Sequence, residues 1–151
     1  MSLSKTYGPG ATLILALLLL PSLLSANPKR CPQFAQEEGA KGIQPEYIKV
    51  EELADDILAK KKLVIVDVRT TAEFTQSHIK GAVSIPLSQI RFRLGEIPEN
   101  RFVVFYCDCP RHLASLAYHF LHEEGYRNMK VLYEGLPGWI QKGYPVEGKV
   151  I

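Results

Sequence analysis

The chain has 151 residues, of which 46% are apolar and 23% are charged. This composition is typical of a globular protein and excludes a disordered, collagenous or low-complexity chain. The 18 basic and 16 acidic residues leave too small a basic excess for a nucleic-acid binder, and three cysteines are too few for a disulfide scaffold. The length allows one domain with an appendage and excludes a two-domain enzyme.

Residues 1–26 predict a secretory signal peptide. A polar start containing Lys5 is followed by the unbroken apolar run Ala11–Leu20 and by a small residue at Ala26, which is the order of a cleavable signal. We therefore expect cleavage after Ala26 and a periplasmic or secreted protein. The alternative is an uncleaved membrane anchor, the only membrane contact that the sequence allows, but the run is short and Pro21 interrupts it.

Residues 27–45 predict a flexible arm, because they mix Pro, Gly and both signs of charge without periodicity. The arm contains Cys31, which we expect to be free or paired with a partner, since nothing near it indicates catalysis. The folded domain is expected over residues 46–149.

The folded part predicts alternating strands and helices. In chain order we expect a short strand at Tyr47–Val50, a helix at Glu51–Lys60, a strand at Leu63–Val68, an extended piece at Ala82–Pro86, a strand at Phe102–Tyr106, a helix at Leu113–Glu124 that Gly125 caps, and a strand at Lys130–Tyr133. Continuous β-branched runs suit strands that are covered on both faces. The pattern therefore predicts an α/β fold with a mostly parallel sheet.

In both predicted helices the apolar residues are spaced so that they fall on one face. In the first helix this face contains Leu53, Ile57 and Leu58, and its acids lie in the first turns as the helix dipole favours. Lys60–Lys62 is interpreted as the end of this helix rather than as a phosphate-binding patch. The apolar face of the second helix is expected to contain Leu113, Leu116, Ala117 and Phe120.

Cys107 directly follows the predicted strand Phe102–Tyr106. Ligands of open parallel sheets bind beyond the carboxyl ends of the strands. The next residues lead into a helix, whose first N–H groups and partial positive charge favour a thiolate. We expect these donors to lower the pKa of Cys107 below about 8.5 and to bind a second sulfur or an anion, with Arg111 and His112 as cationic donors. The alternative is a buried, inert cysteine.

A series of short motifs runs through the folded part. They are Val64–Arg69, Glu73-Phe74, His78–Ala82, Ile85-Pro86, Val104–Cys107, Gly125-Tyr126, Val131-Leu132, Gly135, Gly138-Trp139 and Gly143–Val146. In this order they resemble a rhodanese-like (sulfurtransferase) domain that extends over about residues 47–148. The resemblance implies an open parallel sheet of about five strands with helices on both faces, and it identifies Cys107 as the active position.

The resemblance also implies a reaction. A sulfane sulfur moves from a small donor, thiosulfate or a persulfide, to Cys107, and cyanide, a thiol or a partner protein then removes it. Low thiolate pKa and preorganised donors would support such chemistry. The substrate-binding loop would contain Asp108, Cys109, Pro110, Arg111, His112 and Leu113. No metal or organic cofactor is expected, and neither is a nucleic-acid partner.

The loop departs from the family's usual Cys-x-x-Gly-x-Arg-Ser pattern. It lacks the glycine and moves the arginine forward to Arg111. Pro110 removes a backbone donor, and Asp108 adds a negative charge beside the nucleophile. Both changes disfavour thiosulfate as the natural donor, although Arg111 and His112 offset them in part. The related phosphatases carry an arginine where this chain has Leu113, which disfavours phosphate-ester hydrolysis.

The remaining candidates leave alternatives open. Cys109 is either a resolving thiol for Cys107 or a small apolar residue turned inward. Structural roles are expected for Asp67, which would accept backbone N–H bonds, and for Arg69 and Glu73, which would pair across a turn; the alternative is direct contact with substrate. His78 is expected to make fixed hydrogen bonds, with a proton shuttle as the alternative. The function hypotheses are a sulfurtransferase, a redox or sulfur-relay protein that uses Cys107 and Cys109, and a non-catalytic binding module.

Overall fold

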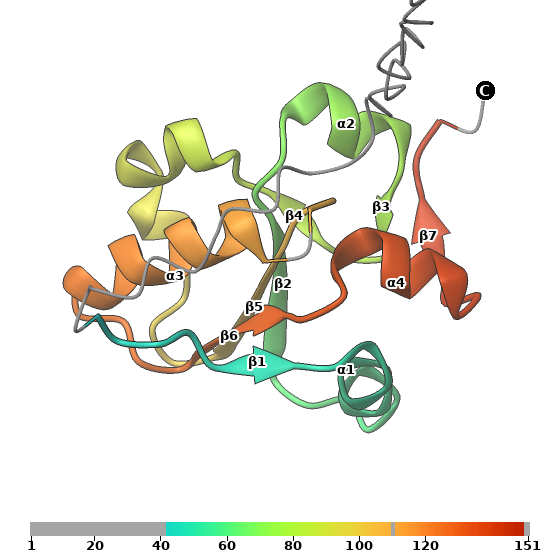
Figure 1. Cartoon of the computed structure of the whole chain (residues 1–151), viewed down its shortest axis with the longest axis horizontal. Helices are drawn as coiled ribbons and strands as arrows, with labels where there is room; N and C mark the ends of the chain where they lie inside the picture. The colour runs from blue at the N-terminus through green and yellow to red at the C-terminus, as the bar shows by residue number, and fades with distance from the viewer. Residues whose placement is uncertain (1–41, 110, 150–151) are drawn as a thin grey trace, which may run out of the picture. The chain divides into compact units, whose positions relative to one another are not determined.

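The computed structural model describes residues 42–109 and 111–149 (Figure 1). The signal peptide predicted at residues 1–26, most of the arm predicted at residues 27–45, Cys31 and Pro110 lie outside the described residues.

A five-stranded parallel sheet forms the centre of the described part. Its strand order is β1-β6-β5-β2-β4, and every neighbouring pair is parallel. The strands are β1 (Tyr47–Ile48), β2 (Leu63–Asp67), β4 (Val83–Ser84), β5 (Phe102–Tyr106) and β6 (Met129–Leu132). The predicted α/β fold with a parallel sheet of about five strands is confirmed.

Helices and 3-10 turns connect these strands. They are α1 (Val50–Leu58), α2 (Thr71–Gln76), η1 (Leu87–Phe92), η2 (Leu94–Glu96), α3 (His112–Glu123) and α4 (Gly135–Gln141). A second, antiparallel sheet pairs β3 (His78–Ile79) with β7 (Val146–Glu147); the sequence did not predict it. Within the described ranges, no helix has the length and apolar character that crossing a bilayer requires.

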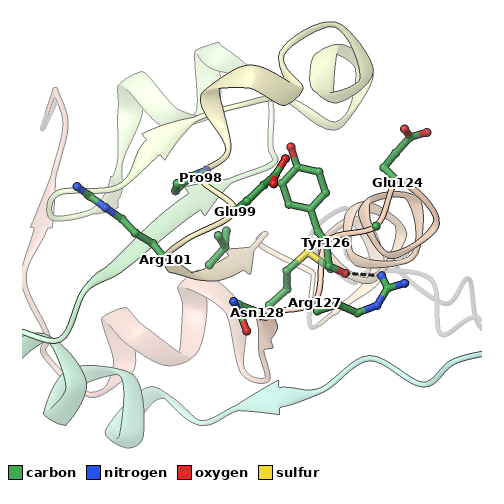
Figure 2. Close-up of a pocket in the computed structure, with 10 residues that line it drawn as sticks. Pro98, Glu99, Arg101, Glu124, Tyr126, Arg127 and Asn128 are labelled. Atoms are coloured by element: carbon green, nitrogen blue, oxygen red, sulfur yellow. Dashed lines mark hydrogen bonds between the residues drawn. The ribbon is translucent and has the colours of Figure 1, made fainter.

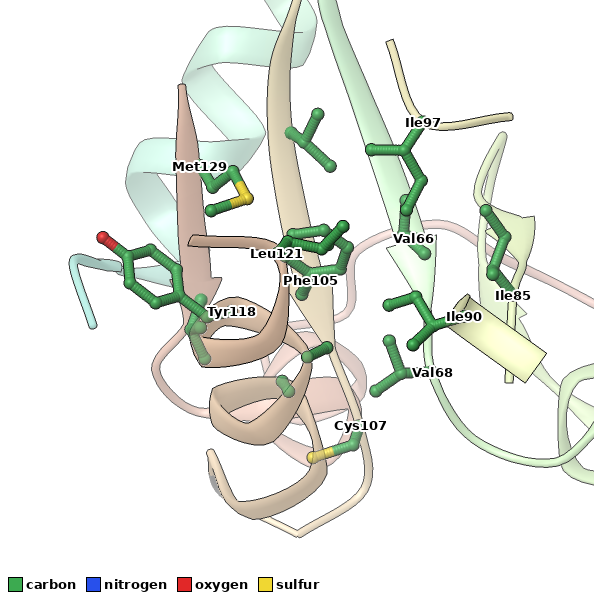
Figure 3. Close-up of a cluster of buried hydrophobic side chains, with 14 residues drawn as sticks. Val66, Val68, Ile85, Ile90, Ile97, Phe105, Cys107, Tyr118, Leu121 and Met129 are labelled. Atoms are coloured by element: carbon green, nitrogen blue, oxygen red, sulfur yellow. The ribbon is translucent and has the colours of Figure 1, made fainter. Parts of the chain in front are cut away.

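The sheet is covered on both faces, as its apolar strands predicted. Side chains of β5 alternate between two core clusters: Val103 and Phe105 pack with α3 and η1, whereas Val104 and Tyr106 pack with α1 and α4. Figure 1 shows α3 and α1 on opposite sides of the strands. Cys107 continues the first set, and Figure 3 shows it at one end of that cluster.

The apolar face predicted for α1 is wrong at its C-terminal end. Leu53 is fully buried, but Ile57 is 37% exposed and Leu58 is 79% exposed. The buried residues lie in the first two turns, because α1 begins at Val50 and only this end of the helix meets the sheet. Lys61 follows the helix and pairs with Asp56, which agrees with a helix end.

The buried stripe of α3 lies one residue beyond the predicted one. Leu116 is 46% exposed, and the buried positions are Ala114, Ala117, Tyr118 and Leu121. The two alanines allow the helix to approach the sheet closely. The predicted cap at Gly125 is confirmed: its φ is +101°, and the following amide donates to the carbonyl of Leu121.

Candidate active site at the end of strand β5

Cys107 is the first residue after β5, at the carboxyl edge of the sheet. It is 1% exposed and belongs to the buried cluster under α3, where Figure 3 shows it near Val68. Its side chain is a free thiol, and Sγ donates a hydrogen bond to the carbonyl of Cys109 at 2.7 Å. The protonated thiol therefore faces the loop between β5 and α3.

Burial raises the pKa of Cys107 above its ordinary value. The backbone amides of Ala114 and Leu113 hydrogen-bond to the sulfur and lower the pKa, whereas the negative charges of Asp108 and Asp67 raise it. The predicted amide donors at the start of α3 are present. The predicted lowering of the pKa is wrong, because loss of solvent at the thiol outweighs two amide hydrogen bonds.

Helix α4 fixes the backbone of Cys107 from a distant part of the chain. The amide of Leu136 donates to the carbonyl of Cys107 at 3.0 Å. Gly135 has a φ of +62°, and a Cβ at this position would lie 2.4 Å from the same carbonyl oxygen. Only glycine therefore allows α4 to approach the backbone of Cys107 so closely.

A buried ion-pair network holds the other side of the loop. Asp67 is fully buried and Arg69 is 5% exposed, and the guanidinium donates to the carboxylate of Asp67 at 2.6 Å. Arg69 also donates to Asp108 at 2.8 Å and to the carbonyl of Ser77 at 2.6 Å. Burial alone would lower the pKa of Arg69, but its hydrogen bonds to Asp67 and their attraction raise it. Arg69 thus ties the first loop residue to the end of β2.

Asp67 and His78 make contacts within the fold. Asp67 accepts the backbone amide of Arg69 at 2.9 Å. His78 stacks on Phe74 at 3.7 Å between ring centroids, and its Nδ1 contacts the carbonyl of Phe74 at 2.8 Å. The expected pair between Arg69 and Glu73 is wrong.

The carboxylate of Glu73 instead caps the start of α2. It accepts the amide of Thr70 at 2.9 Å, and Thr70 accepts the amide of Glu73 in return. This capping box satisfies two amides that the helix leaves unpaired, whereas Arg69 binds the buried carboxylate of Asp67 and the exposed carboxylate of Asp108.

Tyr106 is a site residue that sequence reasoning missed. Its hydroxyl accepts the amide of Ile79 at 3.1 Å and hydrogen-bonds to Asp67, and burial together with the charge of Asp67 raises the pKa of Tyr106. Because Tyr106 precedes Cys107, this contact anchors the end of β5 to β3. The sequence signal was weak, since Tyr106 fits the apolar pattern of a strand.

The second half of the loop contains Arg111, His112 and Leu113. Arg111 has a left-handed backbone with a φ of +76°, and its guanidinium carbon lies 4.4 Å from the centre of the Tyr133 ring. His112 is the first residue of α3, and Leu113 packs against the core cluster beside Cys107. The structure therefore brings Arg111 to the edge of β6, which the sequence alone did not indicate.

Cys109 lies between these two halves. It packs against the cluster that contains Cys107, in agreement with a residue turned inward. Cys109 takes part in a disulfide, whereas Cys107 is a free thiol, so the two are not joined to each other. A role for Cys109 as a resolving thiol stays a prediction.

A pocket of about 230 Å³ lies at the opposite edge of the sheet (Figure 2). Its lining includes Arg101 and Asn128, which precede β5 and β6, whereas Cys107 follows β5. This pocket is therefore separate from the candidate active site. Among the described residues, no group of three or more His, Cys, Asp or Glu side chains is placed to hold a metal ion.

A family model, the rhodanese-like domain, matches residues 49–142. The chain belongs to the rhodanese-like domain family. The matched residues extend from the start of α1 to the end of α4, so the loop that follows β5 lies within the family domain.

Several relatives of this rhodanese-like chain are sulfurtransferases. The sulfurtransferase of Allochromatium vinosum is 34% identical over 97 residues, which cover 64% of this chain and 89% of that protein. Thiosulfate sulfurtransferase PspE of Escherichia coli is 33% identical over 67 residues, 43% of this chain and 64% of that protein. The crystal structure of thiosulfate sulfurtransferase from Pseudomonas aeruginosa has a TM-score of 0.62 and 28% identity, over 68% of this chain and 20% of that one. These relatives support sulfur transfer in general.

Proposed function

We propose that this rhodanese-like chain is a sulfurtransferase that carries sulfane sulfur on Cys107. The observation that carries the proposal is the position of the thiol: Cys107 ends the central strand β5, and the amides of Leu113 and Ala114 hydrogen-bond to its sulfur. Donors fixed at the atom where negative charge develops stabilise that charge without reorganisation.

The reaction has two steps. In the first, Cys107 loses its proton and the thiolate attacks the outer sulfur of a donor such as thiosulfate. The donor's S–S bond breaks, sulfite leaves with the electron pair, and a Cys107 persulfide forms. In the second, a thiolate or cyanide attacks the terminal sulfur and releases the Cys107 thiolate. Both steps are displacements at sulfur, so no external oxidant is needed.

The charges of the loop favour an anionic donor only in part. Asp108 lies next to the nucleophile, but Arg69 pairs with it at 2.8 Å, which reduces its repulsion of a dianion. Arg111 is the positive charge on the other side of the loop. We therefore propose a small anionic sulfur donor and a thiol acceptor, either a small molecule or a partner protein, and no organic cofactor.

Intact mass after incubation with thiosulfate tests the proposal most directly. The wild-type protein is expected to gain about 32 Da, one sulfur atom, and to lose it on addition of cyanide, whereas Cys107→Ser gains nothing. Cys109→Ser is the comparison variant: it removes the disulfide of Cys109 but keeps Cys107, so it is expected to gain sulfur on Cys107 as the wild type does. An unchanged mass for the wild type with both thiosulfate and a persulfide donor contradicts the proposal.

One observation favours a second candidate, a non-catalytic binding module. The pKa of Cys107 is raised and the residue is 1% exposed, as expected for an inert cysteine. The same mass measurement separates the candidates, since a binding module takes up no sulfur. A sulfur-relay protein would take up sulfur but pass it only to a partner protein, so the persulfide would persist with small thiols.

We also propose that the protein is exported, with residues 1–26 as a cleaved signal peptide. The order of charge, apolar run and small residue at Ala26 supports this. N-terminal sequencing of the protein from fractionated cells is expected to begin at Asn27, outside the cytoplasmic fraction. A cytoplasmic protein that begins at Met1 contradicts the proposal.

A further inference from the structure

Arg111 is held at the carboxyl edge of the sheet by two aromatic rings. Its guanidinium carbon lies 4.4 Å from the ring centre of Tyr133, which directly follows β6, and 5.7 Å from that of Tyr47 in β1. The two rings pack edge to face with centroids 5.7 Å apart. Both distances to the cation are within the range of attraction between a guanidinium and an aromatic face.

The two arginines beside Cys107 differ in how their charge is compensated. Arg69 is buried and binds the carboxylates of Asp67 and Asp108. Arg111 has no carboxylate within ion-pair distance in the part of the chain that the structure describes. An aromatic ring holds a cation without a formal negative charge, so Arg111 keeps a positive charge that can attract an anion.

The backbone of Arg111 also indicates a constrained position. Its φ of +76° is a left-handed conformation that costs a non-glycine residue free energy. Arg111 immediately precedes α3, two residues before the Leu113 amide that reaches the Cys107 sulfur. Tyr47 and Tyr133 are 38% and 42% exposed, so this cation and its rings face solution at the edge of the site.

We propose that Tyr133 and Tyr47 are positioning residues, which hold the Arg111 guanidinium where it binds the anionic group of the sulfur donor. The inference rests on the proposed function for its substrate and names the side chains that make the site selective for an anionic donor. The rings fix the position of the cation, while its N–H groups donate to oxygens of the donor, as guanidinium groups do toward oxyanions.

Thiosulfate binding to the Cys107→Ser protein, measured by calorimetry, tests the inference without sulfur transfer. In this background, Tyr133→Leu is expected to raise the Kd about two- to fivefold, the effect of losing one exposed cation–aromatic contact. Tyr133→Phe, which keeps the ring, should bind like the parent, and Arg111→Gln should bind at least as weakly as Tyr133→Leu. Phe92→Leu is the matched control, because Phe92 is 81% exposed on η1.

The inference is overturned if Tyr133→Leu and its parent bind thiosulfate with equal affinity, or if Tyr133→Phe binds it as weakly as Tyr133→Leu. It is also overturned if the parent does not bind thiosulfate. With Cys107 present, Tyr133→Leu should raise KM at unchanged kcat. If the wild type binds thiosulfate with this pattern but takes up no sulfur, the proposed function fails and the positioning role stands. If the wild type takes up sulfur but the Kd for thiosulfate does not change in Tyr133→Leu, the proposed function stands and the positioning role fails.

Discussion

Gly135 is the point where α4 meets the backbone of Cys107, and Gly135→Ala should disturb both stability and the thiol. The added Cβ would lie 2.4 Å from the carbonyl oxygen of Cys107, far inside van der Waals contact. Either α4 or the Cys107 carbonyl must move. Such a movement breaks the hydrogen bond from the Leu136 amide to that carbonyl, which is 3.0 Å long.

The expected magnitude follows from two contributions. A non-glycine residue at a φ of +62° costs about 1 kcal/mol, and the lost hydrogen bond costs about another 1 kcal/mol. Gly135→Ala is therefore expected to lower the free energy of unfolding by about 2 kcal/mol or more. Gly143→Ala is the matched control, because Gly143 has a φ of +72° but nothing within 4 Å of its added Cβ. It should lose only the backbone contribution, about 1 kcal/mol.

Urea unfolding of both variants and the wild type measures these values. The rate at which iodoacetamide alkylates Cys107 in the folded protein adds a local measurement, since a displaced carbonyl moves the thiol. Gly135→Ala should change this rate and Gly143→Ala should not. Equal loss of stability in the two variants, together with equal alkylation rates, would show that the contact between α4 and Cys107 does not constrain the site.

Three further perturbations test other parts of the site. Because the pKa of Cys107 is raised, its alkylation rate should still be rising above pH 8.5, the ordinary thiol range. The stability that this thiol contributes is present below its pKa in the unfolded chain and should be lost as the pH rises toward its pKa in the folded protein. An alkylation rate that reaches a plateau below pH 8 contradicts this prediction. Arg69→Gln leaves a buried carboxylate without a cation and should cost about 3–5 kcal/mol in urea unfolding, whereas Asp108→Asn, at a 47% exposed side chain, should cost less than about 1 kcal/mol; equal costs would contradict the network. Cys107 is free and Cys109 is in a disulfide, so non-reducing peptide mapping should recover Cys107 in an unlinked peptide, and a peptide that joins Cys107 to Cys109 would refute this.

The central strands were predictable because their apolar character does not depend on distant contacts. The run Leu63–Val68 is buried on both sides, and only a strand within a covered parallel sheet meets that requirement. The pair β3–β7 was not predictable, since His78↔Glu147 and Ile79↔Val146 are the whole of its register. Two residues give no periodicity, and the partners are far apart in the sequence.

Helix α4 shows how a turn signal can be overridden. Its sequence Gly135-Leu-Pro-Gly-Trp139 favours a turn, and the sequence analysis did not predict a helix there. Pro137 lies in the first turn, where a helix tolerates a missing N–H. Trp139 is 2% exposed, and its Nε1 donates to the carbonyl of Pro145 at 2.9 Å. Burial of this ring stabilises a helix that local propensity does not favour.

At the candidate site, the sequence predicted the position of Cys107 but not the direction of its pKa shift. The end of β5 and the start of α3 placed Cys107 beside the amides of Leu113 and Ala114, as expected. The pKa shift depends on how completely solvent is removed, and no local pattern reports that. The contact between Arg111 and Tyr133 likewise requires β6 to lie beside β5, which is a property of the assembled sheet.

The charges around Cys107 bear on how a protonated, buried thiol would react with the anionic donor that we propose. The negative charges nearest the sulfur belong to Asp67 and Asp108, and Arg69 binds both. An approaching dianion would by itself raise the pKa of the thiol further, because like charges disfavour ionisation. Arg111 is the cation that can offset this effect, so its binding of the donor and the loss of the Cys107 proton should be coupled. The sulfur can then exchange its hydrogen bond to the Cys109 carbonyl for attack on the donor, with the amides of α3 already in place.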